Sequence, residues 1–405
     1  MEIVKEKKKI DYSKVNIGTE LECFIIERDS FANISKNQSQ EVFQTLIKKY
    51  GWSGREIASL GEIQKIEKNI FSYPVKIVFD TTYSLFEIVT TNPAPSLDVL
   101  EKLHEISLSD LRQALHEHNL IIWPFGVAPA STGLLKLPQN TQEEIINDRF
   151  YYTIRKLCCI DRFAHMISHQ VNIDIPFPKM LPAINAFYKN LAPIIEKFAN
   201  AAVFFNQKLY KEGRYYWWSD AYPQLKDKRR GFYTHEFPPQ EYKTWNDFLQ
   251  WVFYHNILIF RNNDTYVPVE KYFSFHKFLK KGKAQFKNKD GNLIETGVTK
   301  EDLENFFLQI NIEFAPHFDF NSDYKIDDFL GYYRNNDLDN FFNKHCRHCW
   351  LEIRPCSPHL EENAMVLPRY FYDIVMNLDR YIEDAKKISW GEAKITRDRA
   401  IGYIK

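Results

Sequence analysis

The chain has 405 residues, of which 44% are hydrophobic and 16% aromatic, enough to form a substantial buried core. Its 53 Lys and Arg residues balance 53 Asp and Glu residues, so no overall positive charge would attract nucleic acid or an anionic membrane surface. No apolar run approaches the length of a membrane-spanning helix, and the Lys-rich start lacks the apolar centre of a signal peptide. We therefore expect a cytoplasmic protein without a nucleic-acid or membrane partner, with residues 1–14 as a flexible basic arm and 15–405 as a single domain.

The six cysteines are too scattered for a disulfide scaffold in a chain of this length, so we expect reduced thiols. Cys346 and Cys349 have the spacing of a zinc-binding pair, but no second cysteine pair lies at a matching distance.

Between the first strand and residue 92 the sequence reads as β-rich. Apolar side chains then recur at helical spacing from residue 96 to residue 118, which predicts an amphipathic helix over one face of the sheet. A strand follows in "LIIWPFGVAP", a short helix is expected over 147–160, and "HQVNIDIPFP" predicts another strand. One long or two shorter helices are expected over 180–211.

The second half of the chain is less regular. The aromatic and basic segment 213–235 has no clear periodicity, which is typical of a functional loop. Helical pieces and a Lys-rich hairpin with an Asp-Gly turn are expected over 240–345, followed by a strand in "CWLEIRP" and a last helix over 367–387. No linker or internal repeat divides the chain.

The stretch "NIGTELECFI" places two glutamates, Glu20 and Glu22, on one face of the first strand, because alternate side chains of a strand point the same way. The opposite face is apolar. Two carboxylates about 7 Å apart on one face repel each other unless a cation lies between them. A solvent-facing edge strand is the ordinary alternative for one such stretch.

The same pattern recurs on three further strands, each with an apolar face and a face of carboxylates, amides or arginine. The polar members are Asp80, Glu87, Gln170, Asn172, Asp174, Glu352 and Arg354.

Four such strands predict a sheet curved around a polar cavity. The expected fold is α/β (α+β), with a curved, mostly antiparallel sheet that forms an active-site funnel and helices packed on its outer face. Carboxylate oxygens suit Mg²⁺ or Mn²⁺, and arginine binds phosphate or carboxylate in a bidentate manner. This face therefore indicates phosphoryl transfer from a nucleotide to an acidic substrate.

The ordered set "IGTELECF", "FDTTYSLFEIVTTNPAPSL", "SHQVNIDI", "GRYYWWSDAYP" and "WLEIRP" resembles the glutamate–cysteine ligases, nearest to the plant and proteobacterial type. These belong to the wider group of glutamine-synthetase-like carboxylate–amine ligases, and the resemblance covers roughly residues 15 to 360. It implies that ATP and two or three Mg²⁺ ions bind in the funnel. The γ-carboxylate of glutamate would then be phosphorylated and attacked by the amine of cysteine, the committed step toward glutathione.

The resemblance also implies roles for single residues. The metal ligands would be Glu20, Glu22, Asp80, Glu87, Gln170 and Glu352. Arg214 would act on the glutamyl substrate, and Arg354 would face the phosphates. Further substrate contacts would come from Arg149, Asn172, Trp218 and Asp220, and a further nucleotide contact from Arg347.

The segment before Glu87 and the segment after Arg354 depart from the family pattern, and both border the place where the acceptor or the nucleotide should bind. Three hypotheses therefore remain open: a glutamate–cysteine ligase, an amide ligase that joins another acid or amine in a specialised biosynthetic pathway, and a catalytically silent binding protein. The retained carboxylates argue against the third. The partners would be small-molecule substrates, and the protein would be a monomer or a homodimer.

Overall fold

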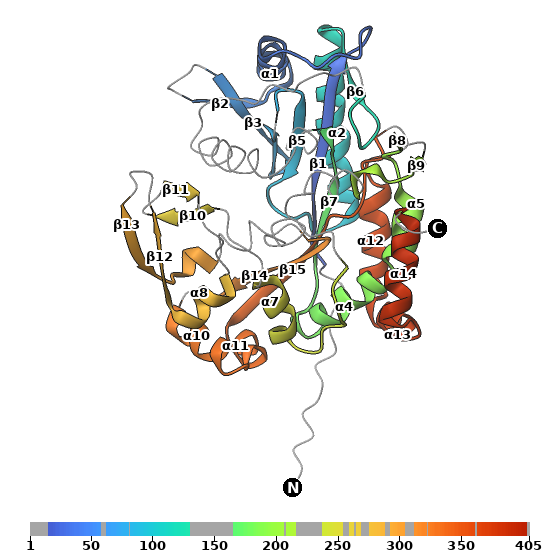
Figure 1. The fold of residues 1–405 in the computed structure, drawn as a ribbon. Helices are drawn as coiled ribbons and strands as arrows, with labels where there is room; N and C mark the ends of the chain where they lie inside the picture. Colours follow the sequence, from blue (N-terminus) through green and yellow to red (C-terminus); the bar gives the residue numbers. More distant parts are fainter. Residues whose placement is uncertain are drawn as a thin grey trace.

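The computed structural model describes residues 15–57, 62–80, 82–129, 165–205, 208–215, 237–253, 259–262, 265–268, 275–287, 292–303, 312–321, 323–360 and 363–402. One nine-stranded sheet organises a mixed α/β fold, and all of its strand pairs are antiparallel (Figure 1). Its strands are β1 (Ile17–Glu27), β2 (Ser53–Ile57), β3 (Glu62–Ile70), β4 (Tyr73–Phe79), β5 (Leu85–Thr90), β6 (Leu120–Trp123), β7 (His169–Asp174), β14 (Phe314–Phe320) and β15 (Cys346–Ile353).

Strand β1 lies near the middle of this sheet. The order is β14-β15-β7-β1-β5-β4-β3-β2, and β6 also pairs with β1. The first half of β1 pairs with β7 and its second half with β6, while β5 pairs along the other edge. The strands that carry the predicted polar faces are therefore neighbours, although they come from distant parts of the sequence.

Helices cover the face of the sheet formed by the apolar side chains. In β1 these are the odd-numbered residues, of which Ile17, Leu21 and Ile25 are fully buried. Phe187 of α4 stacks on Phe314 of β14 at a centroid distance of 5.3 Å. The helices in contact with the sheet are α1 (Lys36–Tyr50), α2 (Leu97–Glu117), α4 (Phe177–Lys189), α11 (Leu338–His345) and α12 (Val366–Met376).

Other helices pack outside this layer. Figure 1 shows the C-terminal helices α12 to α14 together beside α5. The remaining helices are α5 (Leu191–Phe198), α7 (Trp245–Phe253), α8 (Phe275–Lys281), α10 (Ile326–Arg334), α13 (Leu378–Ala385) and α14 (Trp390–Ala400). Three two-stranded sheets complete the description: β8 (Val203–Phe205) with β9 (Lys208–Tyr210), β10 (Ile259–Asn262) with β11 (Thr265–Pro268), and β12 (Lys283–Lys287) with β13 (Leu293–Gly297).

The predicted helix over 96–118 is confirmed as α2, which begins after Ser96, whose side chain accepts a hydrogen bond from the Val99 amide. The prediction that the segment between the first strand and residue 92 is β-rich missed α1. Its start has a complete capping box between Ser35 and Gln38, and Gly51 at φ 73° ends it in the left-handed conformation that glycine adopts at low cost.

Two helix ends were also predicted wrongly. The helical segment expected to run to residue 211 stops at Phe198, and the strands β8 and β9 follow. The helix over 367–387 is two helices, α12 and α13, and α14 follows them.

The Lys-rich hairpin is confirmed by the pairing of β12 with β13. The helix expected over 147–160 lies outside the described residues. In the described part of the chain, no helix combines the length and hydropathy needed to cross a bilayer.

Candidate active site

The predicted carboxylates come together on one face of the sheet because of the strand register. Glu22 of β1 lies directly opposite Glu87 of β5, and Glu20 lies opposite Gln170 of β7. Glu352 of β15 lies opposite Asn172 of β7. Paired residues of an antiparallel sheet point to the same face, with Cβ atoms about 5 Å apart. The acidic face expected from the sequence is thus continuous over four strands.

One part of this face is a cluster formed by Glu22, Glu87 and Asp80, the last of which follows β4. Burial and the nearby Asp80 charge raise the pKa of Glu22 to about 8. Burial, mainly, raises the pKa of Asp80 to about 6. Burial and three neighbouring carboxylates hold the pKa of Glu87 well above its usual value. Without a cation, these side chains resist being charged together.

Glu22 is held in place by hydrogen bonds from β7 and the residue before it. The Ser168 amide donates to Glu22 Oε2 at 2.6 Å, and the Ser168 hydroxyl and Gln170 Nε2 donate to Oε1 at 3.1 and 3.2 Å. Gln170 is 6% exposed, and its Oε1 accepts no hydrogen bond from the described residues. This buried oxygen is therefore still available to a ligand.

The other part of the face is centred on Glu352, whose carboxylate contacts His317 and Arg354. His317 Nε2 lies 2.7 Å from Glu352 Oε2, and the Arg354 guanidinium lies 2.5 Å from Oε1. Burial alone would raise the pKa of Glu352, but the Arg354 charge and the His317 hydrogen bond outweigh it and lower the pKa to about 2. Burial and the Glu352 charge raise the pKa of Glu20 to about 7. Asn172 Nδ2 donates to Glu20 Oε1 at 3.2 Å.

A cavity of about 630 Å³ opens over this second part of the face. Its walls come from β1, β5, β7, β14, β15 and the segment after β5. The volume lies within the range of small-molecule and cofactor sites. The side chains that give it polar character are Glu20, Asn172, Asp174, His317, His348, Glu352 and Arg354.

One wall of this cavity carries three stacked rings. His317 stacks on Trp350 at 5.2 Å with an interplanar angle of 12°, and His348 stacks on the same indole at 5.7 Å and 27°. Asp174 Oδ1 lies 2.9 Å from His348 Nε2, and Asn16 Nδ2 donates to Asp174 Oδ2 at 2.6 Å. The wall is thus a rigid aromatic surface, with a carboxylate bound to each imidazole.

Sequence reasoning missed His317 and did not assign a role to Trp350 or His348. The last two alternate with Glu352 along β15, so the two-residue period could have found them. His317 lies on β14, which was not predicted as a strand. Pro316 interrupts its pattern, and proline is tolerated there because β14 is the edge strand of the sheet.

The donor set fits a hard divalent cation. Carboxylate and amide oxygens face one another across the strands, and burial together with the neighbouring carboxylates raises the pKa values of Glu22 and Glu87. Within the described residues, no three Asp, Glu, His or Cys side chains are already close enough to form a complete metal centre. Mg²⁺ does not require one, because it usually takes one or two carboxylates and completes its shell with water and substrate phosphates.

Arg214 lies inside the protein rather than on the wall of the cavity. It is 7% exposed and forms an ion pair with Glu212, Nε to Oε1, at 2.7 Å. It also donates to the carbonyl oxygens of Pro355 at 2.7 Å and Ile167 at 3.3 Å. Glu212 is itself 1% exposed and accepts a hydrogen bond from the Ser357 hydroxyl. These contacts join the segment after β15 to the chain just before Ser168.

The remaining predicted residues are placed as follows. Arg347 is exposed and contacts both carboxylate oxygens of Asp319 at 2.8 Å, away from the cavity wall. Arg149, Trp218 and Asp220 lie outside the described residues. Cys346 and Cys349 are free thiols, and the Cys349 thiol donates to the Ile175 carbonyl at 3.0 Å.

No protein-family model matches the chain, and comparison with curated proteins finds no match either. Among solved structures, a bifunctional glutathione synthetase from Pasteurella multocida is 11% identical over 96% of this chain and 42% of its own, with a TM-score of 0.42. The chain thus spans about two fifths of that structure. A glutamate–cysteine ligase from Francisella tularensis in complex with AMP is 11% identical over 98% of this chain and 83% of its own, with a TM-score of 0.39.

A third structure, the complex of the prokaryotic ubiquitin-like protein Pup with its ligase, is 9% identical over 96% of this chain and 72% of its own, with a TM-score of 0.29. Identities of 9–11% and TM-scores below 0.5 do not establish the function of this chain.

Proposed function

We propose that the protein is an ATP- and Mg²⁺-dependent carboxylate–amine ligase. One observation carries this proposal: carboxylates from β1, β5 and β15, together with Asp80, share one partly buried face with Arg354. Keeping several carboxylates near one another in a poorly solvated place destabilises the folded protein unless a cation compensates them. A cation held by carboxylates beside an arginine is the usual environment of a nucleotide phosphate.

The residues that would hold Mg²⁺ are Glu20, Glu22, Asp80, Glu87, Gln170 and Glu352, with Mn²⁺ as an alternative ion. When bound, the cation would supply positive charge that offsets the negative charge of the transferred phosphoryl group. Arg354 would contribute a fixed positive charge beside the phosphates. The Glu352 carboxylate holds the Arg354 guanidinium in position, and His317 in turn holds the Glu352 carboxylate. Asn172 would orient the acidic substrate from β7.

The proposed reaction has two steps. A carboxylate is a poor electrophile, so its oxygen first attacks the terminal phosphorus of ATP and releases ADP. The amine nitrogen then attacks the carbonyl carbon of the acyl phosphate, releases phosphate and loses a proton to leave an amide. The rigid, partly apolar cavity would delay the competing attack of water on the acyl phosphate.

The finer proposal is that the acid is glutamate, activated as γ-glutamyl phosphate, and that the amine is cysteine. It rests on the resemblance of the five ordered sequence motifs to glutamate–cysteine ligases. An amide ligase with another acid or acceptor is the alternative, because the segments bordering the cavity depart from the family pattern. The three stacked rings of His317, Trp350 and His348 favour this alternative in one respect, since they offer a flat surface to a larger acceptor.

The test is phosphate release from ATP by the purified protein with Mg²⁺ and glutamate, with and without each of the twenty amino acids and common polyamines, with new amides identified by mass spectrometry. Cysteine should accelerate phosphate release most, 2-aminobutyrate should replace it well, and serine should do so poorly. A pocket for a thiol leaves the serine hydroxyl desolvated at a cost of roughly 1–3 kcal/mol. A better acceptor than cysteine, or amide formation only when another amino acid replaces glutamate as the acid, would support the alternative. No amide with any of these acids and amines would contradict the ligase proposal.

We also expect Mg²⁺ to displace protons from the protein without metal. At pH 7, Glu22 with a pKa of about 8 is mostly protonated and Glu20 with a pKa of about 7 is half protonated. Cation binding requires the charged form, so Mg²⁺ should release on the order of one proton per chain. Calorimetry in buffers of different ionisation enthalpy measures this number. Release of no protons at pH 7 would contradict the proposed binding of Mg²⁺ by these carboxylates.

Glu20 and Glu22 should also make the stability of the protein without metal depend on pH. Their pKa values are higher in the folded state than in the unfolded state, so the folded state binds more protons and stability falls as pH rises from 6.5 to 8. His104, whose pKa burial lowers to about 4, has the opposite effect only below its ordinary value of 6.5. Thermal unfolding should show this fall, and saturating Mg²⁺ should abolish it.

Arg214→Ala tests whether this residue acts on the substrate or holds the fold. Its described contacts predict a structural effect, because the change leaves the buried Glu212 without its cation, at a cost of about 3 kcal/mol. The control is Lys211→Ala at an exposed neighbouring position. A higher KM for glutamate with an unchanged melting temperature would instead support the substrate contact implied by the family resemblance.

A further inference from the structure

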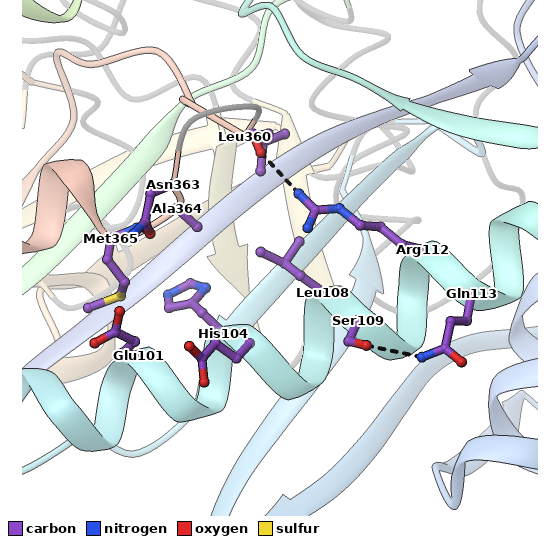
Figure 2. A pocket seen from close by; sticks show the side chains of 11 residues that line it. Glu101, His104, Leu108, Ser109, Arg112, Gln113, Leu360, Asn363, Ala364 and Met365 are labelled. Carbon is purple, nitrogen blue, oxygen red and sulfur yellow. Dashed lines mark hydrogen bonds between the residues drawn. The ribbon is translucent and has the colours of Figure 1, made fainter.

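A second cavity, of about 420 Å³, lies between α2 and the residues Leu360, Asn363, Ala364 and Met365, and we call it the α2 cavity (Figure 2). It is separate from the carboxylate face, because α2 packs on the opposite, apolar side of the sheet. Nothing in the proposed reaction uses it.

The charges of the α2 cavity are arranged along the helix. Figure 2 shows Glu101 at one end, Arg112 at the other and the apolar Leu108 between them. Glu105, which also lines the cavity, follows Glu101 by one helical turn. Arg112 lies seven positions after Glu105, which corresponds to about 10 Å along a helix. Across the cavity, Ala364 and Met365 add further apolar surface.

At each end of the α2 cavity, a charged side chain can still form contacts with a ligand. Arg112 donates one hydrogen bond, from Nη2 to the Leu360 carbonyl at 3.0 Å, whereas a guanidinium has five N–H groups. Glu101 is already paired with Arg369. Glu105 is exposed and forms no ion pair with the described residues, so it is the carboxylate available to a cationic group.

A buried imidazole lines the middle of the cavity. His104 is 2% exposed, and Figure 2 shows its ring between Glu101 and Leu108, directed towards Met365 and Ala364. Its Nε2 lies 2.7 Å from Thr19 Oγ1, and its Nδ1 has no hydrogen-bond partner among the described residues. A buried polar atom without a partner is costly in a native structure, and a ligand group would satisfy it.

We infer that the α2 cavity binds a zwitterion of dipeptide length, with its ammonium group at Glu105, its carboxylate at Arg112 and its central amide at His104. A dipeptide matches this arrangement better than a single α-amino acid, because one carbon separates the two charged groups of an amino acid whereas the helix sets Glu105 and Arg112 about 10 Å apart. The termini of a dipeptide lie farther apart, so the side chains of Glu105 and Arg112 have a shorter distance to bridge. Its side chains would contact the apolar wall.

The α2 cavity is linked to the carboxylate face by one hydrogen bond. Thr19, the partner of His104, directly precedes Glu20 on β1. Thr19 is further fixed by Thr90 Oγ1, which accepts from the Thr19 amide at 2.7 Å. A ligand that fixes the His104 ring would therefore act on the strand that carries two of the proposed metal ligands.

The test is calorimetric titration of the full chain with alanylalanine, alanylleucine and leucylalanine, which does not depend on any catalytic activity. At least one should bind saturably. Its N-acetyl and C-amide derivatives should bind at least about tenfold more weakly, because each lacks one charge-assisted contact. Arg112→Gln and Glu105→Gln, both at exposed positions, should weaken binding to a similar degree. Lys102→Gln, on an exposed position of the same helix outside the cavity, is the matched control and should leave binding unchanged.

Two further outcomes separate this site from the active site. Glu352→Gln should leave dipeptide binding unchanged, and the signal of the His104 imidazole in ¹⁵N NMR should shift on saturation. The inference is overturned if none of the three dipeptides binds, if the acetylated and amidated forms bind equally well, or if binding is lost in Glu352→Gln but kept in Arg112→Gln.

Discussion

Glu87→Gln should abolish ATP turnover and, at the same time, raise the melting temperature of the protein without metal. Glu87 accepts no hydrogen bond from the described residues and faces Glu22 across the β1–β5 pair. Burial and the charges of Glu20, Asp80 and Glu22 raise its pKa, so without a cation a neutral amide is more stable at this position than a carboxylate. The same change removes a proposed oxygen ligand of Mg²⁺, and we expect kcat to fall by at least about a hundredfold.

The two effects are measured separately, by Mg²⁺-dependent ATP turnover and by thermal unfolding at pH 8 without metal. Glu196→Gln is the matched control, since Glu196 is exposed on α5 and should leave both quantities unchanged. If the Glu87→Gln variant keeps its ATP turnover, Glu87 is not one of the proposed Mg²⁺ ligands. An inactive variant with a lowered melting temperature would show that Glu87 supports the fold instead.

Arg397→Met should cause the largest loss of stability. Arg397 of α14 is 3% exposed and lies 3.7 Å from Glu313, which is fully buried just before β14. Its guanidinium also lies over the Tyr215 ring at 5.3 Å. Removing one member of a buried ion pair leaves a charge in a poorly solvated place and typically costs 3–5 kcal/mol. Urea unfolding measures the change.

Two further variants identify the cause. Arg399→Met changes an exposed arginine on the same helix and should have little effect. Adding Glu313→Leu to Arg397→Met should recover much of the lost stability, because the buried carboxylate that lost its arginine is then absent. Equal losses in the Arg397 and Arg399 variants would show that the ion pair is unimportant. The Glu313 carbonyl accepts from the Arg354 amide at 2.9 Å, so this pair also supports the strand end that carries the proposed phosphate-binding arginine.

The acidic face could be predicted because its signal is local. The two-residue period placed Glu20 with Glu22 and set Glu352 beside Arg354 before any pairing was known, and the helix α2 followed from its own 3.6-residue period. Antiparallel pairing then brings these faces together, as the register of β1 with β5 and β7 shows.

Contacts between distant segments could not be predicted in this way. The burial of Arg214 depends on Glu212, Pro355 and Ile167, and nothing in the surrounding aromatic and basic sequence indicates that these atoms meet. The edge strand β14 was missed because proline removes a backbone donor and resembles a strand breaker. The α2 cavity likewise results from packing between α2 and a segment about 250 positions later, as the contact of Arg112 with Leu360 shows.

The order of strands in the main sheet has a consequence for synthesis of the protein. β1 is synthesised long before two of the strands on one side of it, because its neighbour β7 begins at His169 and the next strand, β15, begins at Cys346. Until β7 is synthesised, the first half of β1 has one edge of unpaired backbone groups, and Glu20 and Glu22 lack the strand that completes their surroundings. The edge of β7 then stays open until β15 follows. The nascent chain therefore carries an incomplete sheet while the residues between β1 and β15 are translated, and chaperone binding to the open edge would protect it from aggregation.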